Sequence, residues 1–166
     1  MPAVLFPGSF DPITLGHLDL LRRGCRLFGQ VVIGVGVNAA KTPLFTVEER
    51  VLMIRDLIEL ERLPAEVESF SGLLVDFARR KGVRCVLRGL RGISDLDYER
   101  AMAMTNSTLS PEIETVFLLP SPSTSFIASR LVREIALAGR AVDHLLPAKV
   151  GRLLESRLRE LRDKHS

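Results

Sequence analysis

The sequence predicts an α/β fold: a single domain, residues 1–166, built on a doubly wound sheet of five parallel strands. Three observations lead to this prediction. Short apolar runs alternate with longer segments of helical periodicity along the whole chain. The run 31–37, VVIGVGV, is almost continuously β-branched, as in a parallel strand covered on both faces. The intervening segments are long enough to form the right-handed crossovers that parallel strands require.

Each expected element has its own local signal. In chain order, the apolar runs predict strands at 3–6, 31–37, 66–70, 83–87 and 114–119. The helical patterns predict helices at 14–28, 46–61, 72–81, 94–109, 125–138 and 147–164. Thr46 and Glu49 have the spacing of a capping box, and Ser94 is the expected N-cap of its helix. Gly139 is the expected end of the helix 125–138.

Composition excludes several classes of protein. Hydrophobic residues make up 46% and charged residues 26% of the chain, as in ordinary globular domains. The longest apolar runs have the length of strands, so we expect no membrane partner, and no basic leader indicates a signal peptide. Cys25 and Cys85 lie on separate expected elements without C-x-x-C spacing, which favours free thiols in a reducing, cytoplasmic setting.

The charge balance favours a small anionic substrate. The net charge is +3 with a pI near 9.2, and the arginines gather mainly near 79–91 and 152–162. This surplus is small for a nucleic-acid-binding protein, and we expect no nucleic-acid partner. A non-catalytic nucleotide sensor or RNA-binding module is the alternative from another class. The single Tyr and the lack of Trp speak against a strand that stacks on bases.

The stretch 6–17, FPGSFDPITLGH, is the most informative part of the chain. It joins the first expected strand to the first expected helix. The unpaired N–H groups and the dipole at a helix N-terminus attract phosphate. Gly8 permits close approach of a ligand, Thr14 is the expected N-cap, and His17 adds a donor expected to titrate near neutral pH. The stretch has neither the Walker pattern nor the G-x-G-x-x-G pattern.

Polar residues also follow other expected strands. Lys41 comes soon after the second strand, and Arg88 and Arg91 flank Gly89 directly after the fourth. The segment 120–129, PSPSTSFIAS, leads from the fifth strand into a helix with several hydroxyl groups. Because ligands bind beyond the carboxyl ends of parallel strands, we expect these residues to form one site. Two arginines with bidentate, permanently charged groups suit phosphate oxygens.

These motifs resemble a known family. The run 7–12, PGSFDP, with TLGH at 14–17 resembles the T/H-x-G-H signature of the nucleotidylyltransferase superfamily. The runs 41–50, 88–91 and 97–99 are similar to those of phosphopantetheine adenylyltransferases. The resemblance implies a Rossmann-like nucleotidylyltransferase fold. It also implies reversible adenylyl transfer from ATP to 4′-phosphopantetheine, giving dephospho-coenzyme A and pyrophosphate, with Mg²⁺ as cofactor and a homohexameric assembly.

The same resemblance assigns roles to individual residues. It implies that the catalytic residues are His17, Lys41 and Arg91. It implies that the acceptor, 4′-phosphopantetheine, is bound by Ser9, Lys41, Leu74 and Arg88. It implies that ATP is bound by Ser9, Phe10, His17, Gly89, Leu90, Arg91, Glu99, Thr124, Ser125, Phe126, Ile127, Ala128, Ser129 and Arg130. The chain departs from the usual family pattern with Ser9 for Thr, Gly72 for Asp and Ala128 for Ser.

The expected chemistry needs no catalytic base. A phosphate monoester has its second pKa at about 6 and is therefore already a nucleophile near pH 7. We expect in-line attack on the α-phosphorus without a covalent enzyme intermediate, driven by positioning and charge stabilisation. The nearest alternative is a nucleotidylyltransferase of the same fold that uses nicotinamide mononucleotide or a sugar or alcohol phosphate as acceptor.

Overall fold

The computed structural model describes residues 3–37 and 42–163 and confirms the predicted fold class. Within these ranges, five strands form one parallel sheet in the order β3-β2-β1-β4-β5. The strands are β1 (Val4–Gly8), β2 (Val31–Gly36), β3 (Ala65–Phe70), β4 (Cys85–Gly89) and β5 (Glu114–Leu118). The chain winds outward from β1 in one direction and then returns to add β4 and β5 on the other side. The switch point therefore lies between β1 and β4.

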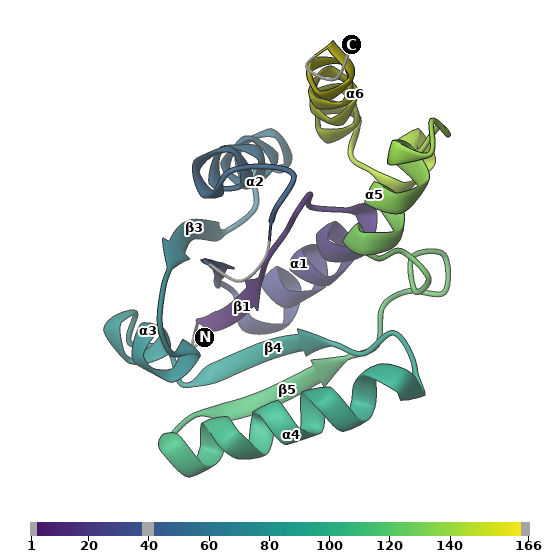
Figure 1. The fold of residues 1–166 in the computed structure, drawn as a ribbon. Coiled ribbons are helices and arrows are strands. Elements are labelled where there is room, and N and C mark those ends of the chain that lie inside the picture. The colour runs from purple at the N-terminus through teal and green to yellow at the C-terminus, as the bar shows by residue number, and fades with distance from the viewer. Residues whose placement is uncertain (1–2, 38–41, 164–166) are drawn as a thin grey trace.

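Helices cover both faces of this sheet (Figure 1). They are α1 (Leu15–Phe28), α2 (Val47–Glu61), α3 (Leu74–Arg80), α4 (Ile93–Leu109), α5 (Ser129–Leu137) and α6 (Ala148–Asp163), with a 3₁₀ turn at Asp143–Leu145. Side chains alternate across the strands. Val4 and Phe6 pack with α1, α2, α5 and α6, whereas Leu5 packs with α3 on the opposite face. The α4 helix lies along β5 and contacts α3.

The predicted N-caps of two helices, α1 and α2, are confirmed. Thr14 is the extended N-cap of α1, and Thr46 caps α2. The backbone N–H of Glu49 donates to Thr46 Oγ1 at 3.2 Å, and the Thr46 N–H donates to the Glu49 carboxylate at 2.8 Å. This is the reciprocal arrangement expected of a capping box. None of the helices in the described ranges combines the length and apolar character that a membrane span needs.

Three helix starts differ from the predictions. The α3 helix begins at Leu74, two residues later than predicted. The α4 helix begins at Ile93 with Gly92, not Ser94, as its extended N-cap. The α5 helix begins at Ser129, four residues later than predicted. The hydroxyls of Thr124 and Ser125 donate to carbonyls three residues earlier, which holds this segment in turns rather than in a helix.

Candidate functional site

The imidazole of His17 is fixed at the first turn of α1. The backbone N–H of Thr14 donates to His17 Nδ1 at 3.1 Å, and Thr14 Oγ1 lies 3.0 Å from the same nitrogen. The N–H of His17 in turn donates to Thr14 Oγ1 at 3.4 Å. Because Nδ1 accepts a backbone hydrogen bond, the neutral ring carries its proton on Nε2. His17 therefore presents Nε2–H as a donor whose orientation is set by the helix cap.

The electrostatic surroundings of His17 correct one expectation. Burial, and then the positive charges of Arg91 and Arg88, lower the pKa of His17 from 6.5 to about 4. Burial disfavours the charged ring, and like charges add to that effect. His17 is therefore neutral near pH 7, and the expected titration near neutrality is wrong. The ring donates a hydrogen bond without carrying a charge.

This pKa gives a testable pH dependence of stability. Because the unfolded chain binds a proton on His17 below about pH 6.5 and the native state does so only near pH 4, stability falls as pH drops through this window. The slope from this one group is at most about 1.4 kcal/mol per pH unit. We expect urea unfolding of His17→Gln, whose side chain can retain the cap, to show a shallower loss of stability between these pH values. An identical slope in both proteins would contradict the pKa.

The ring of Phe10 supports the imidazole from the core side. Phe10 is 2% exposed, and its ring packs edge-on against His17 and Phe6 at centroid distances of 5.1 and 5.4 Å. A Cβ on Gly8 would lie 2.9 Å from this ring, so the close packing requires glycine there. The ring of Phe10 therefore holds His17 in place, and only the backbone of Phe10 is left to make the predicted contact with the nucleotide.

Arg88 and Glu99, which the sequence placed on different ligands, form one ion pair. Arg88 Nε and Nη2 donate to the two Glu99 carboxylate oxygens at 2.7 and 2.5 Å, and Nη1 donates to the Pro7 carbonyl at 2.8 Å. Glu99 is 8% exposed. These contacts fix the guanidinium near the end of β1, where its charge helps to lower the pKa of His17. Arg88 itself lies within β4 rather than beyond it.

A pocket of about 210 Å³ opens beside this ion pair. Leu74 at the start of α3 lies on its wall, as the sequence predicts, and Phe70 and Met102 make the wall more apolar. Thr115 also lines the pocket, and its buried hydroxyl has no hydrogen-bond partner in the described part of the chain. The pocket thus combines an apolar wall with a charged end at Arg88, and Thr115 is a residue that sequence reasoning missed.

The segment after β4 lies beside the same site. Leu90 continues the pairing with β5, because its N–H donates to the Leu118 carbonyl at 3.0 Å. A Cβ on Gly89 would lie 2.4 Å from Leu20 of α1, so glycine lets β4 pack closely against that helix. Arg91 is exposed and pairs with Asp95 at 2.9 Å. Its positive charge helps to lower the pKa of the His17 imidazole.

The 121–129 segment packs onto the first turn of α1. A Cβ on Gly16 would lie 3.3 Å from the Thr124 carbonyl oxygen and 3.4 Å from that of Ile127, so the segment approaches the helix where glycine leaves room. Asp19 anchors its start, accepting hydrogen bonds from the Ser121 N–H at 3.0 Å and hydroxyl at 2.8 Å. This anchor is a second feature that the sequence reasoning missed.

The residues of this segment differ in what they offer a ligand. Ile127 is buried, Phe126 is 60% exposed, and Ser129 donates to the Pro12 carbonyl at 2.8 Å. Ala128 is the N-cap of α5, and no side chain in the described ranges caps this helix. The first-turn N–H groups of α5 are therefore left for a ligand or for water. Arg130 is exposed and pairs with Glu134 on its own helix.

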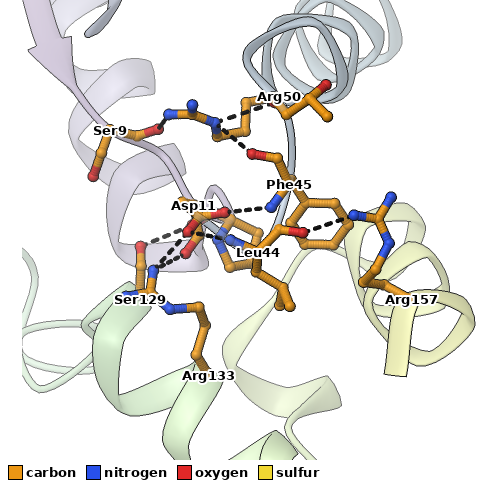
Figure 2. A network of polar contacts seen from close by, with 10 residues as sticks. Ser9, Asp11, Leu44, Phe45, Arg50, Ser129, Arg133 and Arg157 are labelled. Carbon is orange, nitrogen blue, oxygen red and sulfur yellow. Dashed lines mark hydrogen bonds and ion pairs between the residues drawn. The ribbon is translucent and has the colours of Figure 1, made fainter. Parts of the chain in front are cut away.

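Asp11 is the centre of a buried polar network (Figure 2). Its carboxylate accepts hydrogen bonds from the backbone N–H groups of Leu44 and Phe45, both at 2.9 Å, and from Arg133 at 3.0 Å. Arg50, which is 3% exposed, donates to the Ser9 carbonyl at 2.7 Å. Hydrophobic periodicity says nothing of such buried charges. Their sequence signals were the position of Asp11 inside the first motif and that of Arg50 at the end of the run 41–50.

A further arginine reaches this network from α6. Arg157 donates to the Leu44 carbonyl at 2.7 Å, forms an ion pair with Glu49, and lies over the ring of Phe45 at 5.0 Å from its centroid. Lys41, predicted to be catalytic, lies outside the described residues. Leu44 and Phe45, which follow it in the chain, are held by Asp11 through their N–H groups and by Arg157 through the Leu44 carbonyl and the Phe45 ring.

Comparison with known proteins identifies the family. The family model described as cytidylyltransferase-like matches residues 5–135. Phosphopantetheine adenylyltransferase from Prochlorococcus marinus (strain MIT 9211) is 48% identical over 155 residues, covering 93% of this chain and 98% of the relative. Phosphopantetheine adenylyltransferase from Nostoc punctiforme is 52% identical over 147 residues, covering 88% of this chain and 79% of the relative. The chain belongs to the phosphopantetheine adenylyltransferase family.

Membership of the phosphopantetheine adenylyltransferase family confirms the resemblance and the nucleotidylyltransferase fold predicted from the motifs. A solved structure also shares the fold: a bifunctional NMN adenylyltransferase/ADP ribose pyrophosphatase from Francisella tularensis, with a TM-score of 0.72 at 14% identity. The alignment covers 96% of this chain and 51% of that one, so this chain spans about half the length of that bifunctional protein. At this identity the likeness concerns the fold alone.

Proposed function

We propose that this chain transfers the adenylyl group of ATP reversibly to the phosphate of 4′-phosphopantetheine, giving dephospho-coenzyme A and pyrophosphate. It is a nucleotidyltransferase of the phosphopantetheine adenylyltransferase family, whose members carry out this step of coenzyme A biosynthesis. The observation that carries the proposal is the neutral Nε2–H donor of His17, fixed at the α1 N-terminus beside the Arg88–Glu99 pair.

We assign ATP to the N-termini of α1 and α5. Both helices present first-turn N–H groups, and the carbonyls of Thr124 and Ile127 pack against α1 at Gly16, so the two helix starts lie side by side. In this proposal Nε2 of His17 donates to an oxygen of the α-phosphate. The segments 89–91 and 124–130 surround the rest of the nucleotide. Glu99 contributes by holding Arg88 in addition to its predicted nucleotide contact.

We assign the acceptor to the pocket beside Arg88. The apolar wall of Leu74 and Phe70 suits a flexible, mostly aliphatic arm, and Arg88 at its end suits the phosphate. Ser9 and Lys41 complete the predicted phosphate contacts. Ser9 is exposed, and Arg50 fixes its backbone through the carbonyl. Because the charge of Arg88 acts on His17, an acceptor phosphate bound at Arg88 would lie toward His17.

The proposed chemistry is a direct displacement. An oxygen of the acceptor phosphate attacks the α-phosphorus of ATP. The bond between that phosphorus and the oxygen that bridges the α- and β-phosphates breaks, and pyrophosphate leaves. The acceptor oxygen is already deprotonated near pH 7, so the chain supplies no base. Negative charge on the α-phosphoryl oxygens is met by His17, Arg91, the predicted Lys41 and the α1 N-terminus. Charge stabilisation of this kind lowers the barrier because the donors are fixed beforehand.

We propose that Mg²⁺ enters with ATP as part of the substrate. Within residues 3–37 and 42–163, no three His, Cys, Asp or Glu side chains converge to hold a metal ion. Mg²⁺ is commonly held by substrate phosphates with few protein ligands, which suits a site rich in arginine and backbone donors.

A pyrophosphate-release assay tests the function directly. We expect rapid release with Mg²⁺, ATP and 4′-phosphopantetheine. We expect release to be at least about a hundredfold slower with nicotinamide mononucleotide or a sugar phosphate, because those acceptors cannot fill the apolar pocket. Mass analysis should find dephospho-coenzyme A and no adenylylated protein. A trapped adenylyl-enzyme, or equal rates with nicotinamide mononucleotide, would contradict the proposal.

We propose a homohexamer in the cytoplasm. The α4 helix carries large apolar side chains at the surface, with Ile93 89%, Tyr98 66% and Met104 61% exposed. Apolar side chains gathered on one helix favour association with a further chain. Analytical ultracentrifugation of the purified protein measures the assembly, and a monomer at micromolar concentration would contradict this part of the proposal.

A further inference from the structure

Two side chains one turn apart attach α5 to the loop after β1. Ser129 Oγ donates to the Pro12 carbonyl at 2.8 Å, and Arg133 donates to the neighbouring Asp11 carbonyl. Residues four apart lie on the same face of a helix, so this face of α5 holds two consecutive peptide carbonyls. The contact fixes the position of α5 along the loop as well as its distance from it.

The carboxylate of Asp11 completes the attachment. It is 4% exposed and lies 3.0 Å from Arg133, while the N–H groups of Leu44 and Phe45 donate to the same carboxylate (Figure 2). A buried carboxylate that accepts several hydrogen bonds holds the donors in one arrangement. Arg133 thus has its charge balanced by the residue whose backbone it also binds.

The attachment links the two helix starts assigned to ATP. The loop at Asp11 and Pro12 leads directly into Thr14, the cap that orients His17. We propose that Arg133 is a positioning residue that sets the N-terminus of α5 relative to His17 without touching either substrate. This inference rests on the proposed ATP site. Since small misplacements of reacting groups cost up to about 10²-fold in rate, the position of α5 matters to turnover as well as to binding.

The test compares three variants by ATP affinity, acceptor affinity and thermal stability. Arg133→Met removes both contacts of the guanidinium, and Arg133→Lys keeps the charge. Arg22→Met is the matched control, because it breaks a bidentate ion pair with Glu61 that joins α1 to α2 away from the site. We expect Arg133→Met to weaken ATP binding, measured by equilibrium dialysis, at least about tenfold and to lower kcat. Arg133→Lys should recover most of the ATP affinity.

Acceptor binding separates positioning from general damage. Asp11 keeps its hydrogen bonds to Leu44 and Phe45 in Arg133→Met, so we expect affinity for 4′-phosphopantetheine within about threefold of the parent protein. Equal losses for both ligands, or an ATP affinity matching that of Arg22→Met, would overturn the inference. If the parent protein binds ATP but releases no pyrophosphate with 4′-phosphopantetheine, the proposed function fails, while the comparison of ATP affinities still decides the role of Arg133.

Discussion

Replacing His17 with alanine is expected to reduce turnover by about 10²–10³-fold, because one fixed donor to the developing charge is lost. The same change removes the acceptor for the Thr14 N–H, which costs stability as well as activity. His17→Gln separates the two effects, since glutamine at this position of a capping box can accept that hydrogen bond. We expect this variant to unfold near the parent midpoint while its turnover stays low. Pyrophosphate release at saturating substrates provides the measurement.

His144 provides the control for this prediction. It is exposed in the 3₁₀ turn at Asp143–Leu145, away from the first turn of α1. We expect His144→Ala to turn over at the parent rate. If His17→Ala also stayed within about threefold of the parent, the imidazole would not be the donor that the mechanism requires.

The second large effect is expected at Arg88. Arg88→Met leaves Glu99, whose side chain is 10% exposed, without its partner and should lower the free energy of unfolding by about 3 kcal/mol. It also removes the predicted phosphate contact, which should raise the KM for 4′-phosphopantetheine about tenfold to a hundredfold. Urea unfolding and acceptor titrations measure the two effects separately.

A double variant distinguishes stability from recognition at this site. Arg88→Met with Glu99→Gln removes the buried unpaired charge, so we expect stability to recover while acceptor binding stays weak. Arg79→Met serves as the control, because its pair with Glu112 is exposed and solvent screening leaves such a pair with little effect on stability. Recovery of acceptor affinity in the double variant would show that Arg88 acts only through the fold.

The sequence predicted the architecture because periodicity and caps are local signals. The β-branched run at 31–37 contains β2, an interior strand at Val31–Gly36, and Thr14 and Thr46 cap the helices they were expected to cap. The start of α5 was misplaced for a physical reason. Hydroxyl side chains such as that of Ser125 can bond the backbone at a helix start or in a turn. Only the packing of this segment on α1 decides which of the two structures forms.

The parts of the site that could not be predicted depend on contacts between distant residues. Arg88 and Glu99 were assigned to different ligands, because nothing in the sequence indicates that β4 and α4 bring them together. The lowered pKa of His17 likewise depends on burial and on the charges of Arg91, which follows β4, and Arg88, which lies within it. The Asp11–Arg133 contact joins residues far apart in the chain, and a charged residue in a loop or helix is usually expected at the surface.

Nitrogen NMR of the His17 ring, with and without a non-hydrolysable ATP analogue, tests whether His17 lies beside the α-phosphate of bound ATP. We expect a pKa of His17 near 4 in the free protein. We expect a higher pKa in the complex, because triphosphate oxygens offset the positive charges of Arg88 and Arg91. The proton should stay on Nε2 and its resonance should shift on binding. An unchanged pKa together with an unshifted Nε2 resonance at saturating analogue would contradict the placement of the α-phosphate beside His17.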